Sequence, residues 1–362
     1  MSLRTFFLCW LACLCCSAWA ARDPLDEPGF TAVGDARSIN DGVVTALAQD
    51  ERGLIWIGTA VGLVRHDGYQ LRRVAVGGVA GDAAKPGSSF VRALLAAPGG
   101  VLWVGLEGEG LARLDLLRQS WARYAPDADR PGALAHGTVR ALALDLDGAL
   151  WVGTTGGGLH RLAAGATRFD RYTRAAGALP DDRVQSLCVD RRGDLWVGTW
   201  NGLVRLRRGG SRFEPVASDP AQPLSLSGRI VSMLGQGPDG RIWAGTRQGE
   251  LVLIEPGTGA VSAAEQAPTV PDGGPSGVAR SINAMAVVGP DEVWVSSADG
   301  IELRHGGTGR VTTRLTHDRR KRWGLAANNV VALLRERSGG MWVGSYGGGL
   351  QRHSPGSGLW VR

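Results

Sequence analysis

Residues Leu150–Thr154 read LWVGT, and this five-residue pattern occurs seven times along the 362-residue chain. Successive tryptophans of the pattern lie 47, 48, 45, 47, 51 and 48 residues apart. A near-constant period of this length indicates a repeat protein in which each repeat is one supersecondary unit. The other six copies are IWIGT (Ile55–Thr59), LWVGL (Leu102–Leu106), LWVGT (Leu195–Thr199), IWAGT (Ile242–Thr246), VWVSS (Val293–Ser297) and MWVGS (Met341–Ser345).

Each repeat has the same internal plan, which is clearest in residues 138–173. Two apolar segments, Thr138–Leu144 and Leu150–Thr154, flank the turn DLDG, and two shorter strands follow the turn TGGG. Four short antiparallel strands per repeat are typical of a propeller blade. The sequence therefore predicts an all-β fold, a seven-bladed β-propeller over residues 38–362. Its blades are expected over residues 38–75, 86–124, 134–173, 180–217, 225–265, 277–314 and 326–362.

The repeated Trp and Gly have a packing interpretation. Alternate side chains of a strand point to opposite faces, so Trp151 and Gly153 share one face. Propeller blades stack face to face, and a large ring beside a missing side chain allows neighbouring sheets to interdigitate. We therefore assign the seven tryptophans to structure, and we expect Trp151→Ala to be strongly destabilising.

Two segments are candidates for closing the ring. Phe30–Val33 can add a strand to the last blade, or Leu359–Val361 can form the outermost strand of that blade. The sequence leaves both open, and residues 21–37 are assigned to an N-terminal lead-in that contains the first candidate.

The first 20 residues have the features of a secretory signal peptide. They hold a single charge at Arg4, an apolar stretch over Thr5–Cys16 and the small-x-small sequence Ala18-Trp19-Ala20. We expect cleavage after this sequence and a periplasmic location. Lipid attachment at Cys13 and a retained membrane anchor are the alternatives.

Cysteine content and charge exclude several classes of function. The expected mature chain keeps Cys188 alone, so it has no internal disulfide, and we interpret Cys188 as a small buried apolar side chain. The net charge is +6, but the only basic run is Arg319–Arg322, which we interpret as solvated surface. Because the protein is expected to be exported, we predict no nucleic-acid partner.

Motifs for catalysis, metal binding and cofactor binding were not found. The six histidines form no H-E-x-x-H pattern, and the chain contains neither a phosphate-binding P-loop nor a nucleophile elbow. We therefore expect no metal, no cofactor and no catalytic residue, and we predict that the protein is not an enzyme.

The repeat resembles that of the two-component regulator propeller family. The resemblance is carried by VTALAQDERGLIWIGTAVGLVRHDG (Val44–Gly68), VQSLCVDRRGDLWVGTWNGLVRL (Val184–Leu206) and VVALLRERSGGMWVGSYGGGLQRH (Val330–His353). Blades five and six match least well, because Arg247–Glu250 replaces the usual glycine-leucine and Ser296-Ser297 replaces Gly-Thr. The resemblance implies a periplasmic sensor region of a bacterial hybrid histidine kinase or diguanylate cyclase. It also implies a membrane-bound signalling partner or a C-terminal kinase or cyclase region, neither of which this sequence shows.

The rim of the central channel is where we expect a ligand to bind. If the first strand of each blade runs downward, the loops between second and third strands share one rim with the loops that join blades. Binding residues gather on loops held by a rigid scaffold. The candidate ligand-binding residues of this rim are Glu107, Glu109, His136, Trp200, Asn201, Arg247, Asp299 and Tyr346. We interpret Trp200 and Tyr346 as exposed rings that stack on a sugar or peptide.

Three functions are compatible with these observations. The first is sensing of a small ligand, such as an oligosaccharide or a peptide. The second is a propeller enzyme similar to streptogramin lyases, with His136, Glu107 or Asp299 as acid or base. The third is a scaffold for another periplasmic protein.

Overall fold

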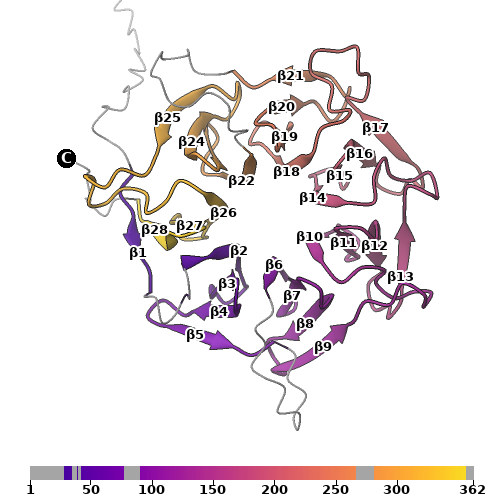
Figure 1. Ribbon diagram of the computed structural model, residues 1–362, viewed down its shortest axis with the longest axis horizontal. Helices are drawn as coiled ribbons and strands as arrows, with labels where there is room; N and C mark the ends of the chain where they lie inside the picture. Colours follow the sequence, from indigo (N-terminus) through magenta and orange to yellow (C-terminus); the bar gives the residue numbers. More distant parts are fainter. Residues whose placement is uncertain (1–27, 35–38, 40–41, 77–89, 266–280, 356–362) are drawn as a thin grey trace, which may run out of the picture.

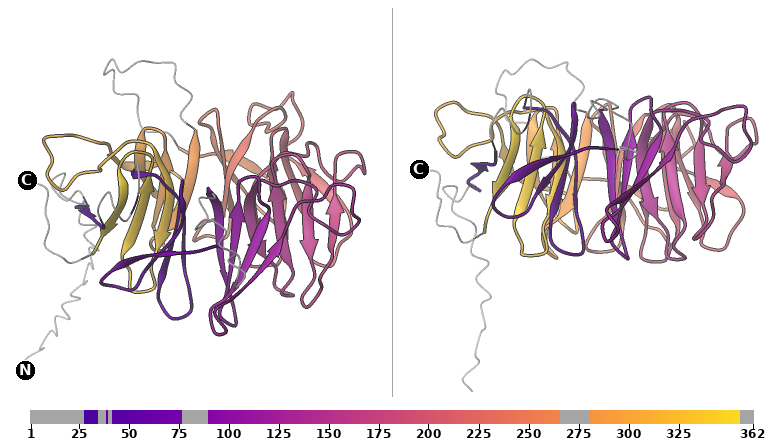
Figure 2. Two further views of the ribbon diagram at one scale, coloured as in Figure 1. Left: turned by 60° about the horizontal axis from the view of Figure 1, so that its bottom comes forward. Right: turned by 90° about the horizontal axis from the view of Figure 1, so that it is seen from below.

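The strands of the protein form a ring of seven blades. The structure is a computed structural model that describes residues 28–34, 39, 42–76, 90–265 and 281–355. These residues form seven antiparallel sheets of four strands each, arranged around a central axis (Figure 1). Side views show the strands running between the two faces of the ring (Figure 2). The predicted seven-bladed β-propeller is therefore confirmed.

Each blade contains an inner strand A, then strands B and C, and an outer strand D (Figure 1). The A strands are β2 (Val44–Gln49), β6 (Val91–Ala97), β10 (Val139–Leu144), β14 (Val184–Val189), β18 (Val231–Gln236), β22 (Ile282–Val287) and β26 (Val330–Arg335). The B strands are β3 (Ile55–Thr59), β7 (Val101–Leu106), β11 (Leu150–Thr154), β15 (Leu195–Thr199), β19 (Ile242–Thr246), β23 (Glu292–Ser297) and β27 (Met341–Ser345). The C strands are β4 (Gly62–His66), β8 (Leu111–Asp115), β12 (Leu159–Leu162), β16 (Gly202–Leu206), β20 (Leu251–Ile254), β24 (Gly300–His305) and β28 (Gly349–His353). The D strands are β5 (Leu71–Val74), β9 (Ser120–Tyr124), β13 (Phe169–Tyr172), β17 (Phe213–Val216), β21 (Val261–Ala263), β25 (Val311–Leu315) and β1 (Thr31–Ala32).

The N-terminal strand closes the ring. β1 pairs antiparallel with β28, so it is the outer strand of blade 7 although it begins the described chain. Phe30 is 2% exposed, and its ring meets the edge of Trp294 at 6.1 Å between centroids. The closure by Phe30–Val33 is thus confirmed, and the alternative at Leu359–Val361 lies outside the described residues, as does the expected signal peptide.

The Trp and Gly of strand B pack each blade against the next. Trp151 of blade 3 shares an apolar cluster with Val184, Leu195 and Val197 of blade 4. An added Cβ at Gly153 would come within 2.6 Å of Val184 Cγ1, so only glycine allows the two sheets this close. The sequence predicts that the Trp and Gly of strand B lie on the same face of the sheet, and the blades stack through this face.

The aspartate of the A–B turn holds the indole of strand B, which the sequence analysis treated only as a turn residue. In blade 4, Asp190 is 2% exposed, and its Oδ1 accepts hydrogen bonds from the backbone amides of Arg192 and Asp194 at 2.9 and 3.0 Å. Its Oδ2 accepts the Trp196 Nε1–H at 2.9 Å. The same bond joins Trp56 to Asp50 at 2.9 Å and Trp151 to Asp145 at 3.0 Å. One carboxylate thus fixes both the hairpin and the tryptophan.

Blade 5 lacks this carboxylate, which gives a matched test. Gly237 stands in its place, and within the described part of the chain the buried Trp243 Nε1 has no hydrogen-bond partner. We expect Trp196→Phe to lower the free energy of unfolding by about 1–3 kcal/mol more than Trp243→Phe, because only the first leaves a buried acceptor unpaired. Urea unfolding of both variants measures the difference, and equal losses would contradict a stabilising role for the Trp196–Asp190 bond.

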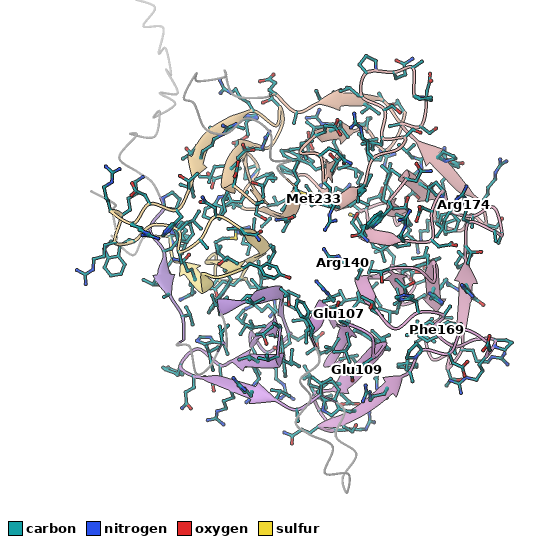
Figure 3. All side chains as sticks on the ribbon, in the orientation of Figure 1. Glu107, Glu109, Arg140, Phe169, Arg174 and Met233 are labelled. Atoms are coloured by element: carbon teal, nitrogen blue, oxygen red, sulfur yellow. The ribbon has the colours of Figure 1, made fainter. Side chains whose placement is uncertain are left out.

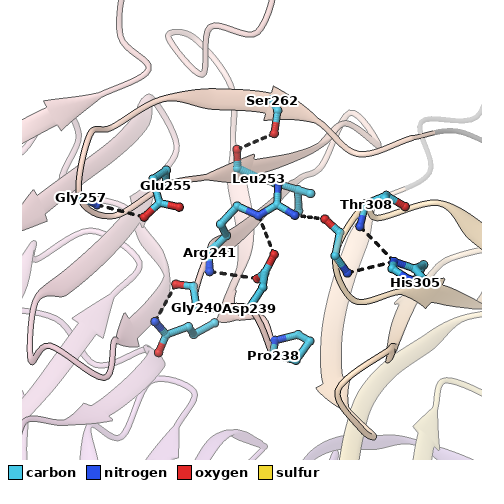
Figure 4. A network of polar contacts seen from close by, with 12 residues as sticks. Pro238, Asp239, Gly240, Arg241, Leu253, Glu255, Gly257, Ser262, His305 and Thr308 are labelled. Atoms are coloured by element: carbon cyan, nitrogen blue, oxygen red, sulfur yellow. Dashed lines mark hydrogen bonds and ion pairs between the residues drawn. The ribbon is translucent and has the colours of Figure 1, made fainter.

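On the face of the ring that carries the A–B turns, polar side chains bond neighbouring blades to each other. Arg241 of blade 5 binds Asp239 Oδ2 through Nε at 2.7 Å and donates from Nη2 to the carbonyl of Gly307 in blade 6 (Figure 4). On the same face, Arg208 of blade 4 forms an ion pair of 2.8 Å with Asp147 of blade 3. The charged side chains of this face are thus used to join blades.

Cys188 lies in strand β14 and is half-buried against the core between blades 4 and 5. Burial raises the pKa of its thiol to about 12, and the charge of Asp190 adds to the effect. The thiol therefore stays protonated, in agreement with the structural role that the sequence predicted.

Candidate functional site

A β-bulge near the start of every A strand sets the shape of the channel mouth. In each blade, the first and third residues of strand A pair with adjacent residues of strand B, so the second residue is extra. A bulge of this kind re-aims the extra side chain. The seven extra residues are Thr45, Arg92, Arg140, Gln185, Ser232, Asn283 and Val331.

Small polar residues at the bulge position join neighbouring blades. Thr45 Oγ1 donates to the carbonyl of Val91 at 2.5 Å, and Ser232 Oγ donates to that of Ile282 at 2.7 Å. Asn283 Nδ2 donates to the Val330 carbonyl at 2.9 Å. The fold therefore needs no long or charged side chain at this position.

Two blades carry an arginine there instead. The guanidinium of Arg92 lies over the ring of Phe90, 4.0 Å from its centroid. It donates to Glu107 Oε2 from Nε at 3.1 Å and from Nη2 at 2.8 Å. Arg92 is thus charge-paired within blade 2.

Arg140, at the same position of blade 3, lies at the central channel (Figure 3). No hydrogen bond or ion pair joins its guanidinium to any residue that the structure describes. The pKa of Arg140 is lowered, first by burial and then by the charges of Arg92 and Arg247, while Tyr346 and Glu107 act in the opposite direction. Three of these groups are charged side chains and the fourth is the phenol of Tyr346, so the surroundings of Arg140 are polar.

The residue that follows strand B forms a second ring at the mouth. Its backbone amide donates back to the residue before strand A, for example from Glu107 to Phe90 at 3.0 Å, from Arg247 to Ile230 at 3.0 Å and from Tyr346 to Asn329 at 2.9 Å. This position of blade 2 lies next to the bulge residue, as the Arg92–Glu107 ion pair shows. The residues at this position are Ala60, Glu107, Thr155, Trp200, Arg247, Ala298 and Tyr346.

Residues of four blades occupy this mouth. Arg92 and Glu107 belong to blade 2, Arg140 to blade 3, Arg247 to blade 5 and Tyr346 to blade 7. The bulge position and the position after strand B are equivalent in every blade, so the ring of sheets places these residues around one mouth of the central channel. We call these five residues the channel mouth. Its charged side chains are three guanidiniums and one carboxylate, so it favours an anionic or polar ligand.

Trp200 occupies the same position in blade 4 but is not the exposed platform that the sequence predicted. It is half-buried, and the guanidinium of Arg183 covers its ring at 4.2 Å from the centroid. Asp181 holds that guanidinium in place through two bonds of 2.8 and 2.6 Å. Tyr346 is half-buried as well. The predicted exposure is therefore wrong for Trp200, because Arg183 packs over its ring.

The other predicted rim residues lie on the expected face with other contacts. Glu109 pairs with Arg123 of strand β9 and lies farther from the channel than Glu107 (Figure 3). Asn201 Oδ1 accepts the Gly228 amide at 3.1 Å, which fixes the next inter-blade loop. His136 Nδ1 accepts the Thr138 amide at 3.1 Å. Asp299 is exposed in the loop after β23.

A pocket of about 420 Å³ opens between blades 2 and 3, away from the channel mouth. Its wall includes Trp103, Tyr124 and the alanine-rich turn 163–166, with Arg113 as the charged residue. Its volume is suitable for a small ligand, but a specific site needs several convergent polar groups. The channel mouth has these groups and is therefore the stronger candidate.

Within the described residues, no group of three or more His, Cys, Asp or Glu side chains is placed to hold a metal ion. Over the same residues, no helix has the length and apolar character needed to cross a membrane.

Arg92 and Arg140 were not predicted as site residues, although the sequence distinguishes them at the second position of the A strand. The A strands begin with V-T-A-L, V-R-A-L, V-R-A-L, V-Q-S-L, V-S-M-L, I-N-A-M and V-V-A-L. A large charged residue at a position that otherwise holds a short side chain marks these two blades. The bulge that turns this position toward the channel is not visible in one sequence.

Two segments of the chain, residues 38–60 and 178–201, match the sequence model of the two component regulator propeller family. The chain therefore carries the two-component regulator propeller repeat, as the resemblance predicted. No curated protein matches the chain.

Solved structures share the fold. The extracellular domain of a protein assigned as a hybrid two component system from B. thetaiotaomicron aligns with a TM-score of 0.72 and 22% identity, over 90% of this chain and 40% of that one. A second such domain from the same organism gives a TM-score of 0.74 and 18% identity, over 91% and 42% of the two chains. This chain thus spans less than half of their length. Virginiamycin B lyase from Staphylococcus aureus aligns with a TM-score of 0.64 and 13% identity, over 90% of this chain and 99% of that one.

Proposed function

We propose that this protein is the ligand-binding propeller of an extracellular sensory system, and that the ligand binds at the channel mouth. The observation that carries the proposal is that four blades place polar and charged residues around one mouth of the channel, namely Arg92, Glu107, Arg140, Arg247 and Tyr346. The propeller supplies a rigid ring, and the mouth residues supply the specific polar groups that a ligand site needs.

The comparisons support a sensory role in particular. The repeat is that of the two component regulator propeller, and the fold is shared with extracellular domains of two-component systems. Both facts are consistent with a location outside the cytoplasm, for which we propose the periplasm. The signalling output would then lie in a membrane-bound partner or in a further region of the same protein.

We infer binding rather than catalysis because two of the three predicted acid or base residues are already bonded. Glu107 is bonded to Arg92, and the Nδ1 of His136 accepts a backbone amide. A general base must be able to reach the proton that it removes. A propeller lyase shares the fold, so turnover is the outcome to look for in every binding experiment.

Calorimetric titration with a panel of neutral and acidic oligosaccharides and short peptides tests the proposal. For any ligand found, we expect Arg247→Ala and Tyr346→Ala each to weaken binding about tenfold or more, since truncation of a central anchor typically costs over 1 kcal/mol. The control is Arg208→Ala, an exposed arginine on the opposite face. Ligand binding that is unchanged in both mouth variants would refute the site, and product formation would favour the lyase.

A further inference from the structure

The channel mouth holds more positive charge than its own acids neutralise. Arg92 is paired with Glu107 at 2.8 Å. The guanidiniums of Arg140, which is partly exposed, and of Arg247, which is exposed, donate no hydrogen bond and form no ion pair to any residue described. This contrasts with the opposite face, where Arg241 and Arg208 are bonded to the neighbouring blades.

Blade stacking does not require an arginine at position 140. The equivalent Thr45 and Ser232 join their blades with short hydroxyl groups, and Val331 has no polar side chain at all. Arg140 is only partly exposed, so a guanidinium there that no described residue pairs loses part of its hydration without compensation, which is unfavourable. The unpaired guanidinium of Arg140 is therefore best explained by a partner that arrives with the ligand.

We propose that the ligand carries a carboxylate, and that Arg140 binds this carboxylate at the channel mouth with Arg247 as the second cation. This inference rests on the proposed function and names the chemical class of the ligand. The planar guanidinium fork matches a carboxylate in a bidentate geometry, which gives both strength and orientation.

The other residues of the channel mouth are compatible with an acidic ligand. The phenol of Tyr346 lies in the same group and can donate or accept a hydrogen bond. Glu107 is bonded to Arg92, so its charge opposes an incoming anion less than a free carboxylate would. A sugar acid and an acidic amino-acid derivative both offer this carboxylate, and the experiment separates them.

Stability of the ligand-free protein gives the first test. We expect Arg140→Met to leave the melting temperature unchanged or to raise it, because methionine fills similar space without an unpaired charge. A structural arginine would behave in the opposite way, and a clear fall in the melting temperature would overturn the inference. Arg174→Met is the control, since Arg174 is exposed at the outer edge of the ring (Figure 3).

Binding of matched acids and neutral analogues gives the second test. The probes are galacturonate against galactose, and N-acetylglutamate against N-acetylglutamine. We expect at least one acid to bind, its neutral analogue to bind about tenfold or more weakly, and Arg140→Met to remove that preference while Arg174→Met keeps it. The acid that binds more tightly than its neutral analogue shows whether the ligand is a sugar acid or an acidic amino-acid derivative.

The outcomes separate this inference from the function on which it rests. Equal binding of acid and neutral analogue, weakened by Tyr346→Ala, would overturn the carboxylate inference and leave ligand binding at the mouth intact. An acid that binds wild type and Arg140→Met equally would overturn the role of Arg140. If none of the four probes binds, the carboxylate inference fails, and the wider panel of neutral oligosaccharides and peptides decides the proposed function.

Discussion

Replacement of Trp151 by alanine is expected to lower the free energy of unfolding by about 3–5 kcal/mol, the usual cost of removing a large buried aromatic side chain. Trp151 is 3% exposed and packs against blade 4 as well as its own blade. Its ring also lies 5.5 Å from that of Tyr172, and its Nε1–H donates to Asp145 at 3.0 Å. Alanine would leave a cavity at a blade interface together with an unpaired acceptor. Urea unfolding followed by circular dichroism measures the loss.

An exposed aromatic residue is the control for this prediction. Tyr69 is 94% exposed, so Tyr69→Ala should change stability by less than about 0.5 kcal/mol. If the Trp151→Ala protein does not fold, Trp151→Phe offers a milder cavity at the same site. A wild-type midpoint for Trp151→Ala would show that this tryptophan does not hold blades 3 and 4 together.

The fold could be predicted because each blade carries its own copy of the same local pattern. The tryptophan, the glycine turns and the alternating strands of each repeat predict a four-stranded blade. The seven copies of the repeat predict the number of blades in the ring. The bond from Asp190 to Trp196 was not foreseen, because a D-x-x-G turn is sufficient to explain the aspartate without it. The two residues lie six positions apart in the sequence, and only the register of the hairpin brings Trp196 Nε1 within 2.9 Å of Asp190 Oδ2.

The channel mouth was predicted only in part, for a geometric reason. Glu107, Arg247 and Tyr346 were named from the loops, but Arg92 and Arg140 lie within strands and looked like ordinary strand residues. The bulge re-aims them, and ring closure brings blades 2, 3, 5 and 7 to one centre. Neither effect can be derived from the order of residues within a single repeat.

The prediction that Trp200 is exposed was wrong for a related reason. Its neighbour Arg183 comes from the preceding inter-blade loop, and the bonds from Asp181 hold it over the indole ring. A loop position indicates the face on which a side chain lies. It does not indicate which other loop covers that side chain.

The stability of the protein is expected to fall by about 3 kcal/mol as the pH is lowered from about 6.5 to about 4, owing to His160 alone. His160 lies in strand β12 and is 0% exposed. Its Nε2 accepts the Ala135 amide at 3.1 Å, so the neutral ring carries its hydrogen on Nδ1. Protonation would place an N–H donor opposite the N–H of Ala135, at a side chain that is closed off from solvent.

The sign of the effect follows from the two protonation equilibria. Burial, with a smaller contribution from Arg171, lowers the pKa of His160 from 6.5 in the unfolded chain to about 4 in the fold. Between these values the unfolded chain binds the proton and the folded protein does not, so acid favours unfolding. Above pH 6.5 both states are neutral at this residue, and His160 contributes no pH dependence.

The variant His160→Gln separates this effect from the titration of carboxylates. Glutamine keeps an oxygen acceptor for the Ala135 amide and does not titrate, so the variant should lose less stability than wild type over the same pH range. Buried Glu336 also makes stability fall in acid, because the bonds from Arg352, Ser338 and Trp342 outweigh burial and lower its pKa. That contribution is common to both proteins and cancels in the difference between their denaturation curves. A flat difference from pH 6.5 to 4 would mean that His160 accepts a proton inside the folded blade, which is incompatible with its burial against Ala135 and Phe169.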